Sequence, residues 1–311
     1  MKKKILLLVI TFIAKTFSAQ LLESDFTWLD QNYTSIKEVK IFKDGKLGII
    51  QQFDGKGNPI FIKNMEFNGD NIFAVWGYIY NDNNKLQKLV VGHSNVGFST
   101  NEYVYKNGKN ETYSYDQDEK NSEINSYPYS KEVKNISSLP DLLNSPTILK
   151  IQKNKKFLSE ETEYNKAGEV LKTINKNQKG KIESELLYSY FENLKRIEFK
   201  TNDANFNSLT DITLDKKGRP IKEKYQKTEV LYNYENDVLK FKETFESGKP
   251  TLKEEYTYNK NGQITQIKTF VADYDKSFKD IFEYNDKGNI KKKKMESIEG
   301  ISTYEYEYLY W

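Results

Sequence analysis

The chain has 311 residues, enough for one large domain or two ordinary ones. It contains no cysteine, which excludes disulfide bonds and thiol catalysis. Of its 48 basic residues only Arg196 and Arg219 are arginines, and because arginine is the preferred reader of bases and phosphates, we expect no nucleic-acid partner.

Residues 1–19 have the pattern of a secretory signal peptide. Lys2, Lys3 and Lys4 precede an apolar run over 5–14, and Ala19 offers a cleavage site. This run is short for a membrane span, so an uncleaved anchor is the less favoured alternative. The rest of the chain carries 44 basic and 45 acidic residues and no further apolar run of membrane length. We therefore expect an exported protein, periplasmic or secreted, with no membrane span in its mature form.

The N-terminal half, residues 20–134, contains a degenerate repeat. An aromatic residue precedes a turn-forming segment at Phe53, Tyr80 and Tyr105, at steps of 27 and 25 residues. Residues 135–147, "NISSLPDLLNSPT", contain two prolines and interrupt the alternation of polar and apolar residues. The sequence predicts a linker or a short helix there, and leaves open whether the two halves share one sheet.

Residues 148–311 contain the clearer repeat. The residues before successive turns are Tyr164, Tyr190, Leu214, Tyr234, Tyr258 and Tyr284, at steps of 20 to 26 residues. Aromatic or apolar residues alternate with polar ones before each turn, and Gly, Asn or Asp follows, which is typical of β-hairpins. About thirteen short strands are expected over 157–311. The predicted fold is all-β: an antiparallel meander of repeated β-hairpins, with a period of about 24–26 residues, forming a long twisted or spiralled sheet.

Three of these turns, "YNKAGEV", "YNKNGQI" and "YNDKGNI", resemble YD repeats, also called RHS repeats. The resemblance extends over 158–311 and is thin over 50–110. It implies strand–turn–strand units that build long sheets, and we expect that unit alone, with no toxin domain. The motif is structural in the family, so it implies no catalytic residue.

Catalytic and metal-binding patterns are weak. His93 is the sole histidine, it has no nucleophile motif around it, and a structural role is expected. Glycoside hydrolysis needs two carboxyl groups, and the chain offers many acids. We expect Glu254, Glu255, Glu283, Glu305 and Glu307 to lie on the solvated faces of strands. The prediction is therefore a non-enzyme with no cofactor and no metal, and a carboxylate-dependent polysaccharide hydrolase is the less favoured alternative.

The tyrosines are the strongest functional signal. They form either the core or an aromatic strip rimmed by polar residues, and the core is favoured because "YEYEYLYW" places tyrosines and acids on opposite faces. The predicted function is an exported, non-catalytic binding or scaffold protein of the cell envelope, with a glycan or protein partner. An immunity-like protein is the alternative in the same class. The candidate strip consists of Tyr256, Tyr258, Tyr284, Tyr304, Tyr306 and Tyr308.

Overall fold

A computed structural model describes residues 33–65, 74–94, 97–115, 130–272, 277–298 and 300–311. The predicted signal peptide, 1–19, lies outside these residues. In the described chain the N-terminal half supplies seven strands: β1 (Ile36–Lys43), β2 (Lys46–Phe53), β3 (Pro59–Asn64), β4 (Ala74–Tyr80), β5 (Leu86–His93), β6 (Gly97–Lys106) and β7 (Lys109–Tyr115).

The second half supplies the thirteen strands that the repeat predicts. They are β8 (Lys156–Tyr164), β9 (Val170–Lys176), β10 (Ile182–Tyr190), β11 (Leu194–Thr201), β12 (Ser208–Leu214), β13 (Pro220–Tyr225), β14 (Thr228–Glu235), β15 (Val238–Glu246), β16 (Lys249–Tyr258), β17 (Ile264–Val271), β18 (Ser277–Tyr284), β19 (Ile290–Ser297) and β20 (Gly300–Tyr310). Short 3₁₀ turns lie at Tyr33–Ser35 and Ala204–Phe206.

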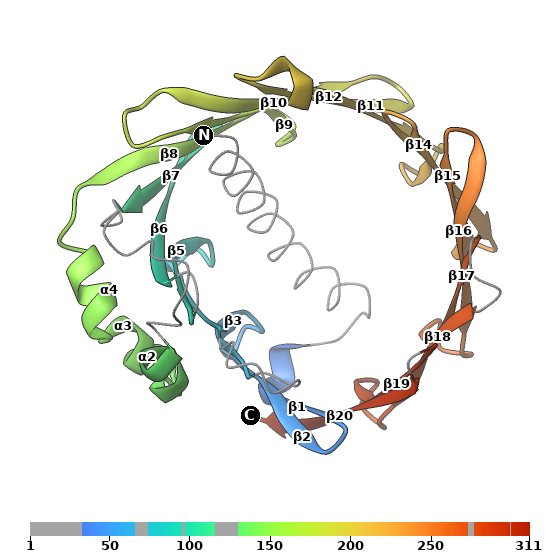
Figure 1. Ribbon diagram of the computed structural model, residues 1–311, viewed down its shortest axis with the longest axis horizontal. Coiled ribbons are helices and arrows are strands. Elements are labelled where there is room, and N and C mark those ends of the chain that lie inside the picture. Colours follow the sequence, from blue (N-terminus) through green and yellow to red (C-terminus); the bar gives the residue numbers. More distant parts are fainter. Residues whose placement is uncertain (1–32, 66–73, 95–96, 116–129, 273–276, 299) are drawn as a thin grey trace.

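The strands form one closed antiparallel barrel (Figure 1). Each strand pairs with the next, and β20 pairs back onto β1, where Tyr308 lies opposite Val39 and Tyr306 opposite Ile41. The all-β hairpin meander is therefore confirmed, whereas the open twisted or spiralled sheet is wrong. A hairpin turn specifies only the strands that it joins, so nothing local in the sequence encodes the pairing of the first strand with the last. Both halves belong to the same sheet.

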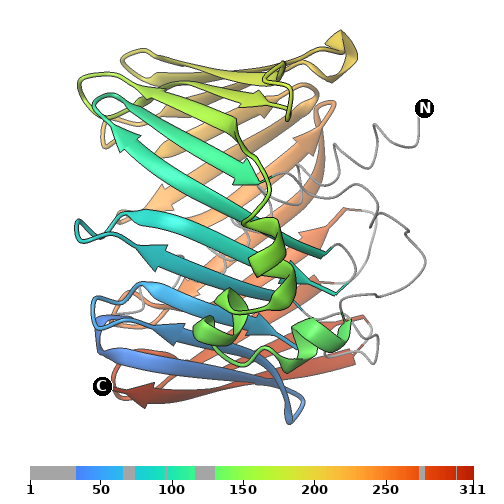
Figure 2. The same cartoon turned by 90° about the vertical axis from the view of Figure 1, so that its left-hand side faces the viewer.

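Three short helices cover part of the outside of the barrel (Figure 2). They are α2 (Ser130–Asn135), α3 (Leu139–Leu143) and α4 (Pro146–Ile151), and they connect β7 to β8. Ser138 and Ser145 cap α3 and α4, each followed by a proline in the first turn, so the prolines of the predicted linker start helices. No helix among the described residues is long and apolar enough to cross a membrane.

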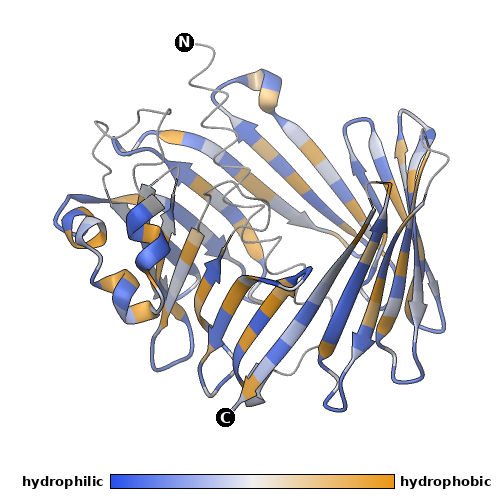
Figure 3. Ribbon diagram, turned by 60° about the horizontal axis from the view of Figure 1, so that its bottom comes forward, coloured by the Kyte–Doolittle hydropathy of each residue, from blue (hydrophilic) through white to orange (hydrophobic). Residues whose placement is uncertain are grey.

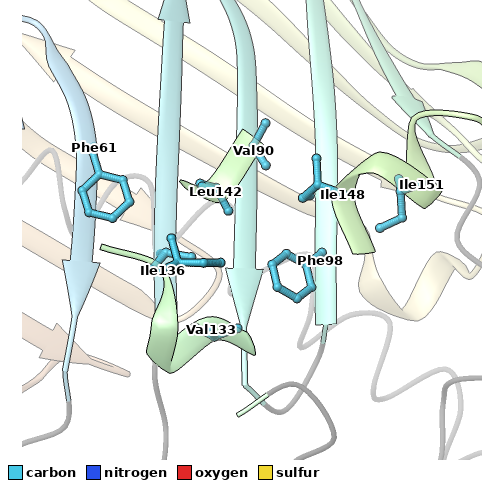
Figure 4. Packing of buried hydrophobic residues seen from close by; sticks show 9 residues of the cluster. Phe61, Val90, Phe98, Val133, Ile136, Leu142, Ile148 and Ile151 are labelled. Atoms are coloured by element: carbon cyan, nitrogen blue, oxygen red, sulfur yellow. The ribbon is translucent and has the colours of Figure 1, made fainter. Parts of the chain in front are cut away.

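The helices bury an apolar patch of the outer wall. Val133, Leu142 and Ile148 pack with Phe61 and Phe98 of the strands beneath them (Figure 4). A Cβ at Gly77 would lie 2.6 Å from the Leu139 side chain, so this strand position must be small for α3 to approach. The sequence left a linker or a short helix open for 135–147, and the structure has three short helices that cover 130–151 with breaks between them.

The strand register distinguishes an outer wall from an inner wall. Paired residues share a face, so Phe61 under the helices, its partner Gln52 and Gln52's other partner Glu38 lie outside. Their chain neighbours, including Val39 and its partner Tyr308, lie inside. Hydrophobic and hydrophilic residues alternate along the strands accordingly (Figure 3). Twenty strands about 4.8 Å apart and tilted by about 40° give a barrel roughly 40 Å across, wider than wall side chains alone fill.

The hairpin turns of the repeat share one hydrogen-bond pattern. In the β16–β17 turn the Asn259 side chain accepts from the backbone N–H groups of Asn261 and Gln263, at 2.9 and 3.0 Å. Gly262 has a φ of +79°, which a residue with a Cβ rarely adopts. This side-chain cap adds to the backbone bonds of the turn, in which the Gly262 N–H donates to the Asn259 carbonyl at 3.0 Å. It explains the Asn or Asp of the motif. The same two bonds recur at Asp54, Asn165, Asn177, Asp215 and Asn285.

Candidate binding pocket on the inner wall

The tyrosines before the turns are fixed by a second recurring hydrogen bond. The hydroxyl of Tyr258 donates to the Leu239 carbonyl at 2.7 Å, and that of Tyr284 donates to the Ile264 carbonyl at 2.6 Å. Each bond reaches back to the preceding hairpin, near the start of its second strand. Because the hydroxyl is held in this way, the ring has a fixed orientation against the inner wall. The same bond is made by Tyr105, Tyr190 and Tyr308.

A pocket of about 610 Å³ lies on the inner wall, at the end of the barrel that carries the β16–β17 and β18–β19 turns. Its aromatic lining comes from Tyr256 and Tyr258 of β16 and Tyr284 of β18. Ile264 of β17, the strand between β16 and β18, and Leu239 of β15, on the other side of β16, add apolar surface. The volume is within the range of roughly 300–1,000 Å³ that ligand pockets occupy.

A small apolar cluster supports the pocket. Tyr256, Ile264, Phe282 and Ile290 are buried together, and Tyr256 is only 5% exposed. Burial raises the pKa of the Tyr256 hydroxyl well above its usual range and that of Tyr284 to about 12. Both phenols are therefore neutral at physiological pH and present aromatic rings without charge.

Two turns supply the polar rim. Asn261 and Gln263 come from the β16–β17 turn, and Asp286 and Lys287 from the β18–β19 turn. The Gln263 side-chain amide donates to the Gly288 carbonyl at 2.8 Å, which ties the two turns together. The rim thus combines amide, carboxylate and ammonium groups around an aromatic lining, an arrangement suited to a ligand with flat apolar faces and many hydroxyl groups.

The structure divides the six candidate tyrosines into two groups. Tyr256, Tyr258 and Tyr284 line the pocket, and Tyr256 is the most buried of the six, at 5% exposed. Tyr304, Tyr306 and Tyr308 are half-buried and pack at the closure of the barrel against a buried cluster that includes Val39 and Ile41. The β1–β20 pairing gives these three tyrosines a packing partner that the sequence did not predict. Tyr306 also packs against the cluster of Tyr256, Ile264, Phe282 and Ile290, so it lies between the two groups. A ligand-binding role for the six tyrosines stays a prediction.

Sequence reasoning missed the polar rim. Asn261, Gln263, Asp286 and Lys287 were assigned only to turn formation. The available signal was the repeat itself, since turns that follow tyrosines on one face must lie beside those tyrosines at the same end of the sheet. That signal became specific only with the barrel, which curves neighbouring turns toward one another.

The candidate acids lie mostly as predicted. Glu283, Glu305 and Glu307 are exposed, and Glu255 lies on the outer wall with a side chain 45% exposed. Glu254 is the exception and corrects the prediction, because it shares the inner face with Tyr256 and pairs with Lys242 on that face.

Two further titratable groups lie on the inner wall away from the pocket. Burial raises the pKa of Glu160, whose carboxylate accepts from the Thr112 hydroxyl at 3.4 Å. His93 lies at the opposite end of the strands, and burial lowers its pKa. Among the residues that line the pocket, Asp286 carries the one carboxyl group, whereas glycoside hydrolysis uses two.

No protein-family model and no curated protein matches the chain. Among solved structures, it is similar to a porin-like protein from Bacteroides uniformis, with 11% identity, 88% of this chain and 98% of that chain covered, and a TM-score of 0.25. It is also similar to a porin-like protein from Bacteroides vulgatus, with 8% identity, the same coverages and a TM-score of 0.33. Likenesses at these TM-scores carry no argument about function.

Proposed function

We propose that this chain is an exported, non-catalytic binding protein of the cell envelope that takes a glycan into the inner-wall pocket. The observation that supports this most strongly is the pair of tyrosine rings, Tyr258 and Tyr284, each locked by its hydroxyl and both facing the same pocket. A ring fixed before binding loses little conformational entropy when a ligand stacks on it. Sugar rings offer the matching apolar face, and their hydroxyl groups match the amides and charges of the rim.

The charged side chains of the outer wall favour a barrel whose outside is exposed to water rather than to lipid. Ion pairs connect neighbouring strands there, including the two-bond contact of Arg196 with Asp211 at 2.7 and 2.9 Å. Two outer-wall phenylalanines have a lysine over the ring: Lys253 lies 4.8 Å from the centroid of Phe241, and Lys268 lies 4.3 Å from that of Phe270. A charged side chain on the lipid face of a barrel costs about 2–4 kcal/mol at the membrane midplane. Other outer pairs are Lys172–Glu185, Lys222–Glu229 and Lys253–Glu255.

Titration calorimetry with oligosaccharides and isolated envelope glycans tests the proposal. Tyr284→Ala removes a ring from the pocket and is expected to weaken glycan binding by about tenfold or more. Tyr190→Ala is the matched control, since Tyr190 makes the same hydroxyl–carbonyl bond outside the pocket. It should lose similar stability and keep its glycan affinity. Equal losses of affinity in both variants, or no binding of any glycan by the wild type, would overturn the proposal.

A pull-down from envelope extract separates the glycan from a protein partner. The protein serves as bait against untreated extract, protease-treated extract and periodate-oxidised extract. The proposal predicts capture that survives protease and is lost after periodate. Capture lost only after protease would instead support the scaffold or immunity-like function.

A further inference from the structure

The pocket spans two successive units of the repeat. Tyr258 and Tyr284 occupy equivalent positions on β16 and β18, one unit of 26 residues apart, and the same type of turn follows each. Neighbouring strands are about 4.8 Å apart, so the two rings are separated by about 10 Å along the wall. In an extended glycan, every second sugar ring recurs at about this spacing.

Tyr234, Tyr258, Tyr284 and Tyr308 occupy equivalent positions and form a row along the inner wall. On one side of the pocket a cation lies over the next ring of this row. One unit earlier, the Arg219 guanidinium lies 4.3 Å from the centroid of the Tyr234 ring. Asp215 holds Arg219 in that place, accepting from its Nε at 2.8 Å. The cation therefore competes with a sugar for the Tyr234 ring, and we take Tyr258 as the end of the binding row on this side.

On the other side of the pocket, the next ring of the row also has a neighbour packed on it. The Lys287 ammonium lies 3.3 Å from the centroid of the Tyr310 ring, and Asn285 and Asn289 donate to the Tyr310 hydroxyl. Tyr308, the next tyrosine of the row, stacks on Tyr310 at 6.0 Å between ring centroids. Tyr258 and Tyr284 are thus left as a pair with a bounded length.

Resting on the proposed function, we propose that the site binds a three-sugar segment of a linear glycan. The first and third sugar rings stack on Tyr258 and Tyr284, and the middle sugar faces Ile264 and Gln263 between them. Arg219 and the Lys287–Tyr310 contact set the two ends of the segment. The spacing of the repeat thereby sets the length of glycan that the site binds.

Binding measurements with glycans of increasing length test the three-sugar length of the site. Cello-oligosaccharides and N-acetylchito-oligosaccharides, from monosaccharide to hexasaccharide, and size-fractionated envelope glycan fragments are titrated into the protein. In the series that binds, affinity should rise by about tenfold from disaccharide to trisaccharide and change by less than about twofold beyond it. Equal affinity for monosaccharide and trisaccharide, or a steady rise to the hexasaccharide, would overturn the three-sugar site and leave the proposal of glycan binding intact. Absence of binding in all series would overturn both.

An extension of the three-sugar site gives a second test. Arg219→Ala exposes the ring of Tyr234, so the variant should gain affinity between trisaccharide and pentasaccharide by about fivefold or more. Arg196→Ala is the control, since Arg196 pairs with Asp211 on the outer wall. If Arg219→Ala folds with wild-type melting behaviour and shows no gain for the longer glycan, Arg219 does not limit the site.

Discussion

At the scale of single residues, the tyrosine and the Asn or Asp of the motif have separate functions. The hydroxyl of the tyrosine reaches a carbonyl of the preceding hairpin, whereas the Asn or Asp closes its own turn. The turn function could be predicted from the sequence because it depends on residues two and four positions away. The tyrosine bond could not, because its acceptor lies 19 or 20 residues earlier at Tyr258 and Tyr284 and is set by the strand register.

Removing one of these hydroxyl groups should destabilise the barrel. Tyr190→Phe keeps the ring and leaves the Val170 carbonyl without its donor, so we expect a loss of about 1 kcal/mol in the free energy of unfolding. Urea denaturation followed by tyrosine fluorescence measures it. Tyr225→Phe, at a residue 44% exposed, is the comparison. The tyrosine bond is not stabilising if both variants have the same unfolding free energy.

Glu160 should make stability fall with rising pH. Burial raises its folded pKa above the unfolded value of about 4.3, so the native state holds the proton more tightly. Its stabilising contribution is fully present below about pH 4 and is lost as pH rises through the raised folded pKa. Glu160→Gln should therefore match the wild type near pH 4 and melt at a higher temperature at pH 7. A variant that is less stable than the wild type at pH 7 would contradict this sign.

At the scale of elements, the period of the sequence predicted the strands well. The thirteen strands expected over 157–311 are present, because alternation and turn residues are local signals. A short helix was one of two alternatives that the sequence left open for 135–147. Its packing could not be predicted, because Phe61 and Phe98 belong to strands far earlier in the chain. The YD-repeat resemblance stays a prediction, since no family model matches the chain.

Turn glycines with positive φ should resist substitution for backbone reasons alone. Gly180 has a φ of +76° and open space where a Cβ would stand, so Gly180→Ala should cost about 1 kcal/mol through strain. Gly55 also has open space and lacks a positive φ, which makes Gly55→Ala the matched control. Thermal melting should show a clear loss for the first variant and none for the second. Equal melting temperatures would mean that the β9–β10 turn relaxes without cost.

At the scale of the whole molecule, closure decides which residues form the site. The pairing of β1 with β20 turns an open row of hairpins into an inner and an outer wall. It places Tyr304 and Tyr308 against the buried cluster of β1, whereas Tyr256, Tyr258 and Tyr284 line the pocket. Tyr306 packs against both the β1 cluster and the cluster beneath the pocket. No signal within one repeat distinguishes these two groups, so the division could not be predicted from the sequence.

The charged outer wall predicts behaviour during fractionation. If the outer wall is exposed to water as proposed, the protein should stay in the supernatant of high-speed centrifugation after cell lysis without detergent. Ion pairs such as Arg196–Asp211 would be costly on a lipid-facing wall. Immunoblots of the supernatant and the membrane pellet measure the distribution. Recovery only from the pellet, and only with detergent, would contradict a barrel that stands in water.

The most direct test of the glycan site is a crystal structure of the protein with the shortest glycan that binds at full affinity. We expect sugar rings stacked on Tyr258 and Tyr284, with their hydroxyl groups bonded to the rim formed by Asn261, Gln263, Asp286 and Lys287. Glycan density on the outer wall, or beside Tyr304 where β20 pairs with β1, would contradict this expectation.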